Sequence, residues 1–403
     1  MYIKFNMSKE TAKKDPYKHH IPSNDLPAVR VGLVGAGWMG KAHTVAFRNA
    51  ALVFNGPYGT PEFTAVADFS LEVAERAARA LGFGKAYGDW RQLVADPEVD
   101  LVDIATPNNL HAEVAIAALQ AGKHVYCEKP LATSAADAER AWKAAQASGK
   151  VNMVGFNNIK HPAQAYAKAL IDAGEIGEVM RFSGTFDQDV LLDPGAPFTW
   201  RHARAVAGSG ALGDLGTHLI SIAQKLMGDF VSISALIRTV VPQRPDAQNP
   251  GKLLTVDTED IAMFHAVFAS GAVGSLAASR MAAGRKHALQ YEIQGTNGSI
   301  AYNQEQMNEI RVYRHTGSRR DQGFTIVPVG PDHPGYSAFY PNAGVGIGYA
   351  DLKIIEIDEL LRAVTADTPV EANFEFGYKV DCVVAAVLKS AEEKRWIEVN
   401  DVL

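Results

Sequence analysis

The chain has 403 residues, of which 47% are hydrophobic and 21% are charged, as in ordinary globular proteins. This composition excludes disordered, collagen-like and disulfide-scaffold chains. The 39 basic and 45 acidic side chains leave a net charge of −6. An acidic chain repels phosphate backbones, so we expect no nucleic-acid partner. The presence of only two cysteines, Cys127 and Cys382, favours a reducing, cytoplasmic compartment over a disulfide framework.

The first residues of the chain form a polar segment rich in lysine, histidine and proline. We predict that residues 1–27 are a tail without a core of its own. The segment has no apolar run of the length that a signal peptide needs, and no later stretch approaches a membrane span. We therefore expect a soluble protein with no membrane partner.

From about residue 28 to 154, short β-branched runs alternate with helical stretches. Strands are predicted at 29–34, 62–68, 99–105, 124–128 and 151–155, and helices at 71–81, 110–121 and 134–148. Strands that alternate with helices of this length indicate βαβ units and a parallel sheet.

The pattern changes in residues 155–403, where several strand-like runs are joined by short glycine turns. This pattern is typical of hairpins, so we predict a second α/β domain with a large open, mostly antiparallel sheet. Its strands are expected at 178–190, 230–241, 258–270, 272–281, 287–295, 298–303 and 309–314. Its helices are expected at 162–173, 211–227, 350–365 and 377–392, and long loops at 242–256 and 329–348.

The strongest local signal follows the first predicted strand, where Gly35, Gly37 and Gly40 fit G-x-G-x-x-G. In this motif the first glycine permits a tight turn, the second lets the backbone approach a pyrophosphate, and the third allows close helix–strand packing. The same segment fits the start of a P-loop, but that motif needs Ser or Thr where the chain has Ala42. The turn therefore indicates a dinucleotide site.

A carboxylate supports this interpretation, because Asp68 ends the second predicted strand, where it can bind the 2′-hydroxyl of an adenosine ribose. Asp68 lies further beyond Gly40 than the usual distance of about 20 residues, and the Gly- and Pro-rich segment 51–61 accounts for the excess. A carboxylate here repels a 2′-phosphate, so we predict NAD as the cofactor of a Rossmann domain at 28–154. Expected contacts at this end are Gly35, Gly37, Trp38, Met39 and Asp68.

Two further motifs follow the fourth and fifth predicted strands, at the carboxyl edge where such sheets bind ligands. The fourth strand leads into Thr106, Pro107, Asn108 and His111, which we expect to contact the cofactor. The fifth ends in Glu128-Lys129-Pro130. A lysine beside a nicotinamide could act near neutral pH, although an isolated tripeptide of this kind is usually a solvated loop.

Asp214 and His218 form a third constellation, in a glycine-rich run at the start of a predicted helix. Because they are four residues apart, they share one helix face, where the carboxylate can orient the imidazole. A surface ion pair is the ordinary alternative. Gly213 and Gly216 weaken a merely structural helix, however, and favour close approach of a ligand to the backbone.

Taken in order, the motifs G-x-G-x-x-G, T-P-N-x-x-H, E-K-P and G-x-L-x-D-x-G-x-H resemble those of the Gfo/Idh/MocA oxidoreductases, over about residues 29–400. The resemblance implies a Rossmann domain followed by an α/β domain whose open sheet covers the substrate. It implies Lys129, Asp214 and His218 as catalytic residues, with Glu128 in the nicotinamide site. By the same analogy we expect a homotetramer.

The resemblance also implies substrate contacts from Lys129, Lys160, Gln188, Asp214 and His218. Lys160 falls in Phe-Asn-Asn-Ile-Lys, where relatives show a segment of the type F-N-Y-R. The lysine keeps the charge but not the planar fork of arginine, and such an exchange is not conservative at a bidentate site. The motifs therefore indicate the reaction more narrowly than the sugar.

The reaction expected from these residues is NAD-dependent oxidation of a ring hydroxyl of a sugar derivative or cyclitol to a ketone, of the 3-dehydro sugar type. His218 is expected to be the general base, oriented by Asp214, while Lys129 stabilises the substrate oxygen. Lys129 is the alternative base, and the sequence does not decide between the two. Inositol dehydrogenases and glucoside 3-dehydrogenases share this frame. A non-catalytic NAD-binding metabolite sensor is the alternative from another class.

Overall fold

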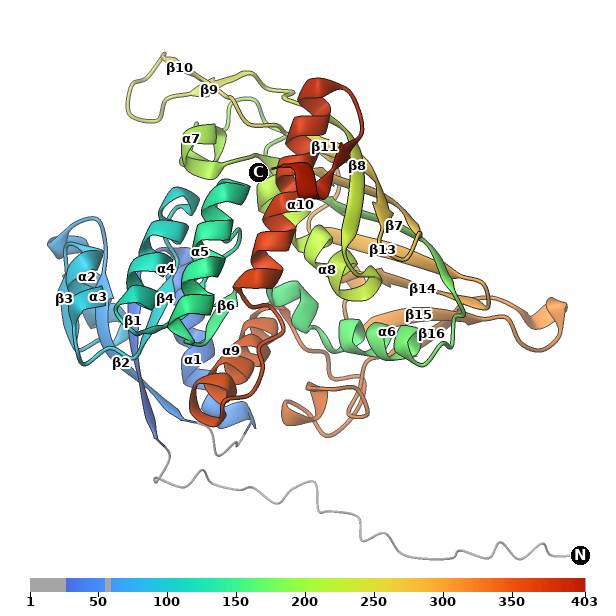
Figure 1. The fold of residues 1–403 in the computed structure, drawn as a ribbon, viewed down its shortest axis with the longest axis horizontal. Coiled ribbons are helices and arrows are strands. Elements are labelled where there is room, and N and C mark those ends of the chain that lie inside the picture. Colours follow the sequence, from blue (N-terminus) through green and yellow to red (C-terminus); the bar gives the residue numbers. More distant parts are fainter. Residues whose placement is uncertain (1–26, 55–58, 403) are drawn as a thin grey trace, which may run out of the picture.

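The computed structural model of the chain describes residues 27–54 and 59–402. In this part of the chain the main features are a parallel sheet, on the left of Figure 1, and a large mixed sheet, on its right. The predicted tail at 1–27 lies almost wholly outside the described residues, and so does part of the segment 51–61. Phe54, within that segment, still belongs to the first helix.

The first sheet is a Rossmann sheet of parallel strands in the order β3-β2-β1-β4-β5-β6, which confirms the predicted fold class. Its strands are β1 (Ala28–Val34), β2 (Thr60–Ala67), β3 (Lys85–Tyr87), β4 (Leu101–Ile104), β5 (His124–Cys127) and β6 (Asn152–Val154). Its helices are α1 (Trp38–Phe54), α2 (Leu71–Leu81), α3 (Trp90–Ala95), α4 (His111–Gln120) and α5 (Ala135–Ser148). The short elements β3 and α3 are not among the predicted ones.

Local signals begin and end these helices. The Ser70 hydroxyl accepts a hydrogen bond from the backbone N–H of Val73 at the start of α2, and Ser134 caps α5 in the same way. Each helix ends at a glycine in the left-handed region, Gly82 and Gly149. Such caps satisfy backbone groups that have no partner inside the helix.

The strand order places a ligand crevice in the first sheet. Strands β2 and β4 lie on opposite sides of β1, so the order of the sheet reverses between β1 and β4. In open parallel sheets the crevice at such a switch point, outside the carboxyl ends of the strands, is where ligands bind. The glycine turn follows β1 and the segment that starts at Ala105 follows β4, so both meet at this crevice.

The second sheet has the order β16-β15-β14-β13-β7-β12-β11-β8-β17 and is antiparallel except between β7 and β12. Its strands are β7 (Val179–Asp187), β8 (Phe230–Arg238), β11 (Ile261–Phe268), β12 (Val273–Ser279), β13 (Ala288–Gly295), β14 (Gly298–Asn303), β15 (Glu309–Arg314), β16 (Thr325–Pro328) and β17 (Ile397–Glu398). A small hairpin of β9 (Gln243–Pro245) and β10 (Leu253–Thr255) lies within the predicted loop 242–256. Strands β16 and β17 are likewise absent from the prediction.

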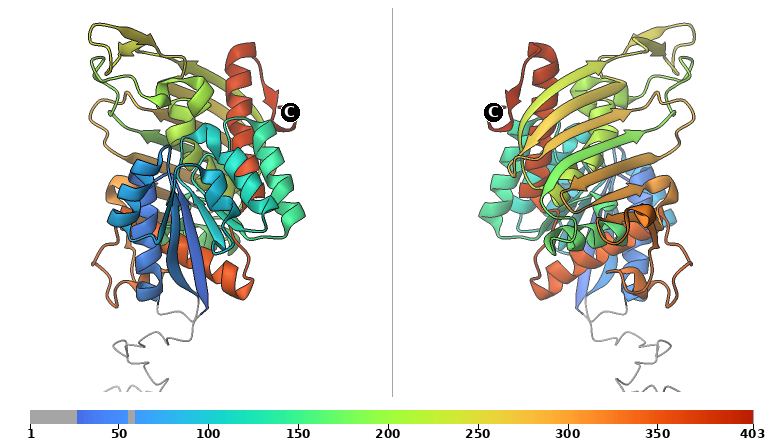
Figure 2. Two further views of the ribbon diagram at one scale, coloured as in Figure 1. Left: turned by 90° about the vertical axis from the view of Figure 1, so that its left-hand side faces the viewer. Right: turned by 90° about the vertical axis from the view of Figure 1, so that its right-hand side faces the viewer.

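One face of this sheet is open. Along β11 Phe264 is buried, whereas Met263 is 55% exposed and points to the other side. Figure 2 shows this outer face in its right-hand view. The remaining helices are α6 (Pro162–Asp172), α7 (Arg204–Ala207), α8 (Thr217–Met227), α9 (Tyr349–Ala366) and α10 (Phe374–Glu393).

The last two long helices return to the first sheet. Helix α9 packs on α1, where Ile357 and Leu361 share a buried cluster with Val31 and Phe47. Helix α10 runs between α5 and β8, as Figure 1 shows. The end of the chain therefore joins the two sheets and contributes side chains to the region behind the crevice. None of the helices in the described ranges is long and apolar enough to cross a membrane.

Candidate active site

A cavity of about 1000 Å³ runs from the glycine turn to the start of α8. Side chains from both sheets line it, and a volume of this order accommodates a dinucleotide together with a small substrate. All the site residues expected from the sequence, except Lys160, lie along this one cavity. These are Gly35, Gly37, Trp38, Met39, Asp68, Thr106, Pro107, Asn108, His111, Glu128, Lys129, Gln188, Asp214 and His218.

The glycine turn has the geometry that a pyrophosphate needs. Gly35 has a φ of +94°, and a Cβ there would lie 2.6 Å from the carbonyl oxygen of Ala105. At Gly40 a Cβ would lie 2.2 Å from the carbonyl oxygen of Gly35. Nothing lies within 4 Å of a Cβ built on Gly37, so the backbone is open to a ligand there, at the N-terminus of α1.

Asp68 follows β2 beside this turn. One carboxylate oxygen accepts the backbone N–H of Ala36 at 2.8 Å and the other that of Phe69 at 2.7 Å. These bonds aim the carboxylate along the cavity and leave lone pairs for further donors. The position suits the ribose hydroxyls of an adenosine, as the sequence predicts.

The loops after β4 and β5 are tied together by His111. Its Nδ1 lies 2.7 Å from the carbonyl oxygen of Pro130, and its Nε2 lies 3.0 Å from that of Thr106. The Thr106 hydroxyl is buried without a hydrogen-bond partner, which is unusual unless a ligand or water completes the site. Together with the open backbone at Gly37, this orphaned hydroxyl fits a bound NAD.

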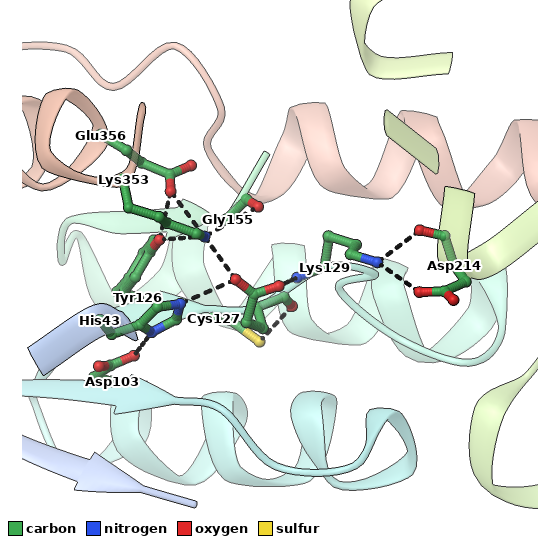
Figure 3. A network of polar contacts seen from close by, with 10 residues as sticks. His43, Asp103, Tyr126, Cys127, Lys129, Gly155, Asp214, Lys353 and Glu356 are labelled. Atoms are coloured by element: carbon green, nitrogen blue, oxygen red, sulfur yellow. Dashed lines mark hydrogen bonds and ion pairs between the residues drawn. The ribbon is translucent and has the colours of Figure 1, made fainter. Parts of the chain in front are cut away.

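Lys129 and Asp214 meet at the far end of the cavity, as Figure 3 shows. The Lys129 Nζ donates to the backbone carbonyl of Asp214 at 2.7 Å and to its carboxylate at 3.3 Å. Burial tends to raise the pKa of Asp214, but the cations of Lys129 and Arg280 outweigh it and lower this pKa to about 2. Asp214 is therefore an anion at neutral pH and fixes the end of the lysine side chain.

Asp214 lies in a π turn at Leu212–Gly216 that leads into α8. Glu259, from the segment before β11, anchors the start of this turn, because its Oε1 accepts the backbone N–H groups of Gly210 at 2.7 Å and Leu212 at 2.9 Å. Single π turns within helices are frequent at functional sites.

The π turn changes one expectation. In the described part of the chain no hydrogen bond joins Asp214 to His218, and the partner of Asp214 is Lys129. Spacing of four residues stacks side chains in an α-helix, but π hydrogen bonds span five residues and shift the register. The expected orientation of His218 by Asp214 is therefore not what the structure shows.

His218 is buried, with the rings of Phe156 and Phe186 edge-on to the imidazole. Burial lowers the pKa of His218 well below its usual value, and the neighbouring cation of Lys129 lowers it further. The imidazole is therefore neutral at pH 7 and able to take a proton. Its Nδ1 has no hydrogen-bond partner.

Lys160 is placed elsewhere. Its Nζ lies 2.6 Å from Glu359 and 3.0 Å from Glu371, and the side chain is only 3% exposed. It is not among the residues that line the cavity. Because Lys160 is buried against two carboxylates and does not line the cavity, it takes no part in the function proposed below.

Gln188 lies in the cavity as expected, and its Nε2 is 2.8 Å from the Nδ1 of His287. Sequence reasoning missed His287, Arg280, Tyr349 and Asn157, which also line the cavity. Arg280 and His287 flank the connection between β12 and β13, beside the end of β7. Polar residues at the ends of sequential strands are the signal that could have indicated them.

Residues 29–156 match a family model described as "Oxidoreductase family, NAD-binding Rossmann fold", and residues 165–301 match one described as "GFO/IDH/MocA C-terminal domain". The two matches follow one another along the chain, as the two sheets do.

Individual relatives extend these matches. The chain is 39% identical over 385 residues to levoglucosan dehydrogenase of Pseudarthrobacter phenanthrenivorans, covering 93% of this chain and 99% of that protein. It is 31% identical over 302 residues to scyllo-inositol 2-dehydrogenase (NAD(+)) of Bacillus subtilis, covering 74% and 80%. A solved structure of levoglucosan dehydrogenase in complex with NADH and levoglucosan superimposes with a TM-score of 0.88 at 41% identity, covering 92% and 99%.

The family models match both sheets in order, and a relative of 39% identity spans almost the whole described chain. The glycine turn and Asp68 lie within the first match, as the cofactor cavity requires. The chain therefore belongs to the Gfo/Idh/MocA family of oxidoreductases, and residues 29–156 are its NAD-binding Rossmann domain.

Proposed function

We propose that the protein oxidises a ring hydroxyl of a sugar derivative or cyclitol to the ketone, with NAD as the hydride acceptor. The single observation that carries this proposal is the end of the cavity, where Lys129, held by Asp214, and a neutral His218 lie together. A cation, an anion and a neutral base in one partly dry site are what alcohol oxidation requires.

Each residue has one task in this proposal. NAD supplies the hydride chemistry when bound, and the protein supplies position and charge. The Nε2 or Nδ1 of His218 takes the hydroxyl proton, while the Lys129 Nζ donates to the same oxygen and stabilises the negative charge that develops there. Asp214 keeps the Lys129 side chain in place. Lys129 as the base is the alternative, with His218 then donating to the oxygen.

The substrate class rests on the relatives and on the lining of the cavity. The relatives are named for levoglucosan and scyllo-inositol, which are polyhydroxylated rings. Gln188, His287 and Arg280 supply hydrogen-bonding groups at the same end of the cavity. We propose as the preferred substrate an anhydrosugar of the levoglucosan type, oxidised at C3. Inositols and glucosides are the other candidate substrates of this polyol class.

A panel of polyols tests this function directly. Purified protein with NAD is mixed with levoglucosan, myo-inositol, scyllo-inositol or simple glucosides, and NADH formation is followed by absorbance. We expect turnover with at least one member, and product analysis by NMR then gives the carbon oxidised. Tight NAD binding without turnover of any member would instead favour the metabolite sensor.

We also propose a cytoplasmic homotetramer. The open face of the second sheet exposes Leu236, Met263 and Val273, each at least half exposed, and apolar patches of this kind mark subunit contacts. Light scattering on a size-exclusion column gives the mass in solution. A monomer would contradict this part of the proposal.

A further inference from the structure

A chain of buried ionic side chains lies next to Lys129, on the opposite side from Asp214 (Figure 3). Asp103 contacts the Nδ1 of His43 at 2.8 Å, the Nε2 of His43 contacts the Oε1 of Glu128 at 3.0 Å, and that oxygen contacts the Lys353 Nζ at 2.6 Å. Lys353 also contacts Glu356 at 3.0 Å. Each of these residues is at most 6% exposed. We call these five residues the buried ion chain.

Glu128 connects this chain to the cavity. Its Oε1 receives Lys353 and His43, whereas its Oε2 accepts the backbone N–H of Lys129 at 3.1 Å. Lys353 and His43 therefore fix the position of one oxygen of the Glu128 carboxylate. The other oxygen holds the main chain of Lys129. Charge-assisted hydrogen bonds of this kind fix geometry more strongly than neutral ones.

Lys353 comes from a distant part of the sequence. It lies on α9, one turn after Tyr349, which lines the cavity, and one turn before Glu356. Its contact with Glu128 spans 225 residues. Gly155 packs directly against the pair, because a Cβ on this residue would lie 2.9 Å from the Lys353 Nζ and 3.0 Å from the Glu128 Oε1.

The charge of Lys353 decides the state of Glu128. A buried carboxylate is costly unless cations and hydrogen bonds compensate it. Burial raises the pKa of Glu128, but Lys353 and then His43 outweigh it and hold this pKa well below its usual value. Without Lys353 the carboxylate loses its largest compensating charge and keeps His43 and Lys129 as its remaining partners. The Glu128 carboxylate then either becomes protonated or moves away from the backbone N–H of Lys129.

We propose that Lys353 is a positioning residue for the reaction: it holds Glu128 in the one orientation that fixes the main chain of Lys129 at the cavity. This inference rests on the role of Lys129 in the proposed function. Lys353 does not line the cavity, whereas Glu128 does, and the 2.6 Å contact joins the two. It links α9 to the reacting end of the Rossmann domain.

Kinetics of Lys353→Met test the proposal with the most active polyol of the panel. A displacement of about 1 Å at Lys129 lowers kcat by about 100-fold, whereas the dissociation constant of NAD and the KM of the polyol change less than about threefold. The matched control is Lys225→Met, which removes another buried lysine, 9% exposed and paired with Glu371. We expect it to change melting temperature but not kcat. Equal losses of kcat in both variants would overturn the proposal.

A double-mutant cycle shows whether the effect passes through Glu128. We expect Glu128→Gln to lower kcat by itself and Lys353→Met to add little in its presence, because residues of one network are not additive. Multiplicative losses of kcat would mean that Lys353 acts by another route. Gly155→Ala disturbs the same pair without removing a charge, and it carries the test if Lys353→Met does not fold.

Crystal structures of the wild type and Lys353→Met with NAD give a readout that needs no turnover. We expect the Glu128 carboxylate to leave the Lys129 N–H and the Lys129 Nζ to leave Asp214. An unchanged Lys129 would refute the inference even if the panel shows activity. If no polyol is oxidised, the proposed function fails, and these structures still decide the positioning role.

Discussion

The two candidate bases of the site differ in what surrounds them. His218 is enclosed by aromatic rings and keeps a free ring nitrogen, whereas the Lys129 Nζ already donates to two oxygens of Asp214. A neutral imidazole has one ring nitrogen that can accept a proton, while a lysine held by a carboxylate is better suited to stabilise an oxyanion. This difference supports our proposal that His218 is the base and Lys129 the electrostatic partner.

Replacing Lys129 tests this assignment at the level of one side chain. We expect Lys129→Ala to lower kcat by about 100- to 10,000-fold, because its ammonium stabilises the negative charge that develops on the substrate oxygen as the proton leaves. The dissociation constant of NADH, measured by fluorescence titration, should stay nearly unchanged and serves as the internal control. Near-normal turnover would remove Lys129 from the mechanism.

We predict that Asp68 sets the preference of the site for NAD over NADP. We expect Asp68→Ser to weaken NAD binding by about 10- to 100-fold, since charge-assisted hydrogen bonds to a ribose contribute about 1.5–3 kcal/mol. The ratio of KM for NADP to KM for NAD should fall, while KM for the polyol stays constant. An unchanged ratio contradicts the assignment.

At the scale of elements, the π turn at Leu212–Gly216 places Asp214 and the start of α8 in the cavity. The turn depends on Glu259, which binds two backbone N–H groups at its start. Without an acceptor these buried groups would each cost about 1–3 kcal/mol. The segment that carries Asp214 thus obtains its shape from a side chain in the segment just before β11.

Variants of Glu259 separate this role from simple packing. We expect Glu259→Ala to lower the free energy of unfolding by about 2–6 kcal/mol, since two N–H groups lose their acceptor, and kcat by about tenfold or more. Glu259→Gln keeps an oxygen for both N–H groups and should restore most of both quantities. Denaturant unfolding and steady-state kinetics measure them. If the glutamine variant is as damaged as the alanine variant, the acceptor is not what shapes the turn.

Helix α9 has a comparable role from the other side of the site. Tyr349, Lys353 and Glu356 lie at helical spacing, so one stripe of α9 runs from the cavity into the interior of the Rossmann domain. The rest of that face is apolar and packs on α1. A single helix from the end of the chain therefore supplies both packing and the cation that Glu128 needs.

For the whole molecule, the buried ion chain couples stability to pH. Burial would lower the pKa of His43, but the carboxylates of Asp103 and Glu128 outweigh burial and the repulsion from Lys353, and they raise this pKa from 6.5 to about 9. A folded-state pKa above the unfolded one means that the protonated form favours folding. This contribution is complete below pH 6.5 and is lost as pH rises through about 9.

We predict that the loss of this stabilising contribution of His43 can be measured by comparing the wild type with His43→Gln. The unfolding free energy of the wild type should fall relative to the variant between pH 6.5 and 9, by an amount on the order of 3 kcal/mol. Denaturant melts at several pH values measure it, and the subtraction removes every group common to both proteins. A constant difference across this range would show that His43 does not titrate there.

Much of the architecture could be predicted because its signals are local. The period of apolar residues, the serine caps of α2 and α5 and the glycine turn each depend on a few neighbouring residues. The carboxyl ends of parallel strands meet at one edge, so Asp68, Thr106 and Lys129 could be placed at one site from their positions in the sequence. Short elements such as β3 and β17 could not, because two or three residues carry too little periodicity.

The sequence by itself determined the two-domain α/β fold, the preference for NAD and the three polar residues at the reacting end, since all of these follow from motifs whose chemistry is contained in adjacent residues. Only the tertiary structure determined which charged side chains pair with one another. It showed Asp214 bound to Lys129 rather than His218, Lys160 held between Glu359 and Glu371, and Lys353 beside Glu128. These pairings join residues up to 225 positions apart, and burial, which makes such charges depend on a partner, is a property of the folded molecule.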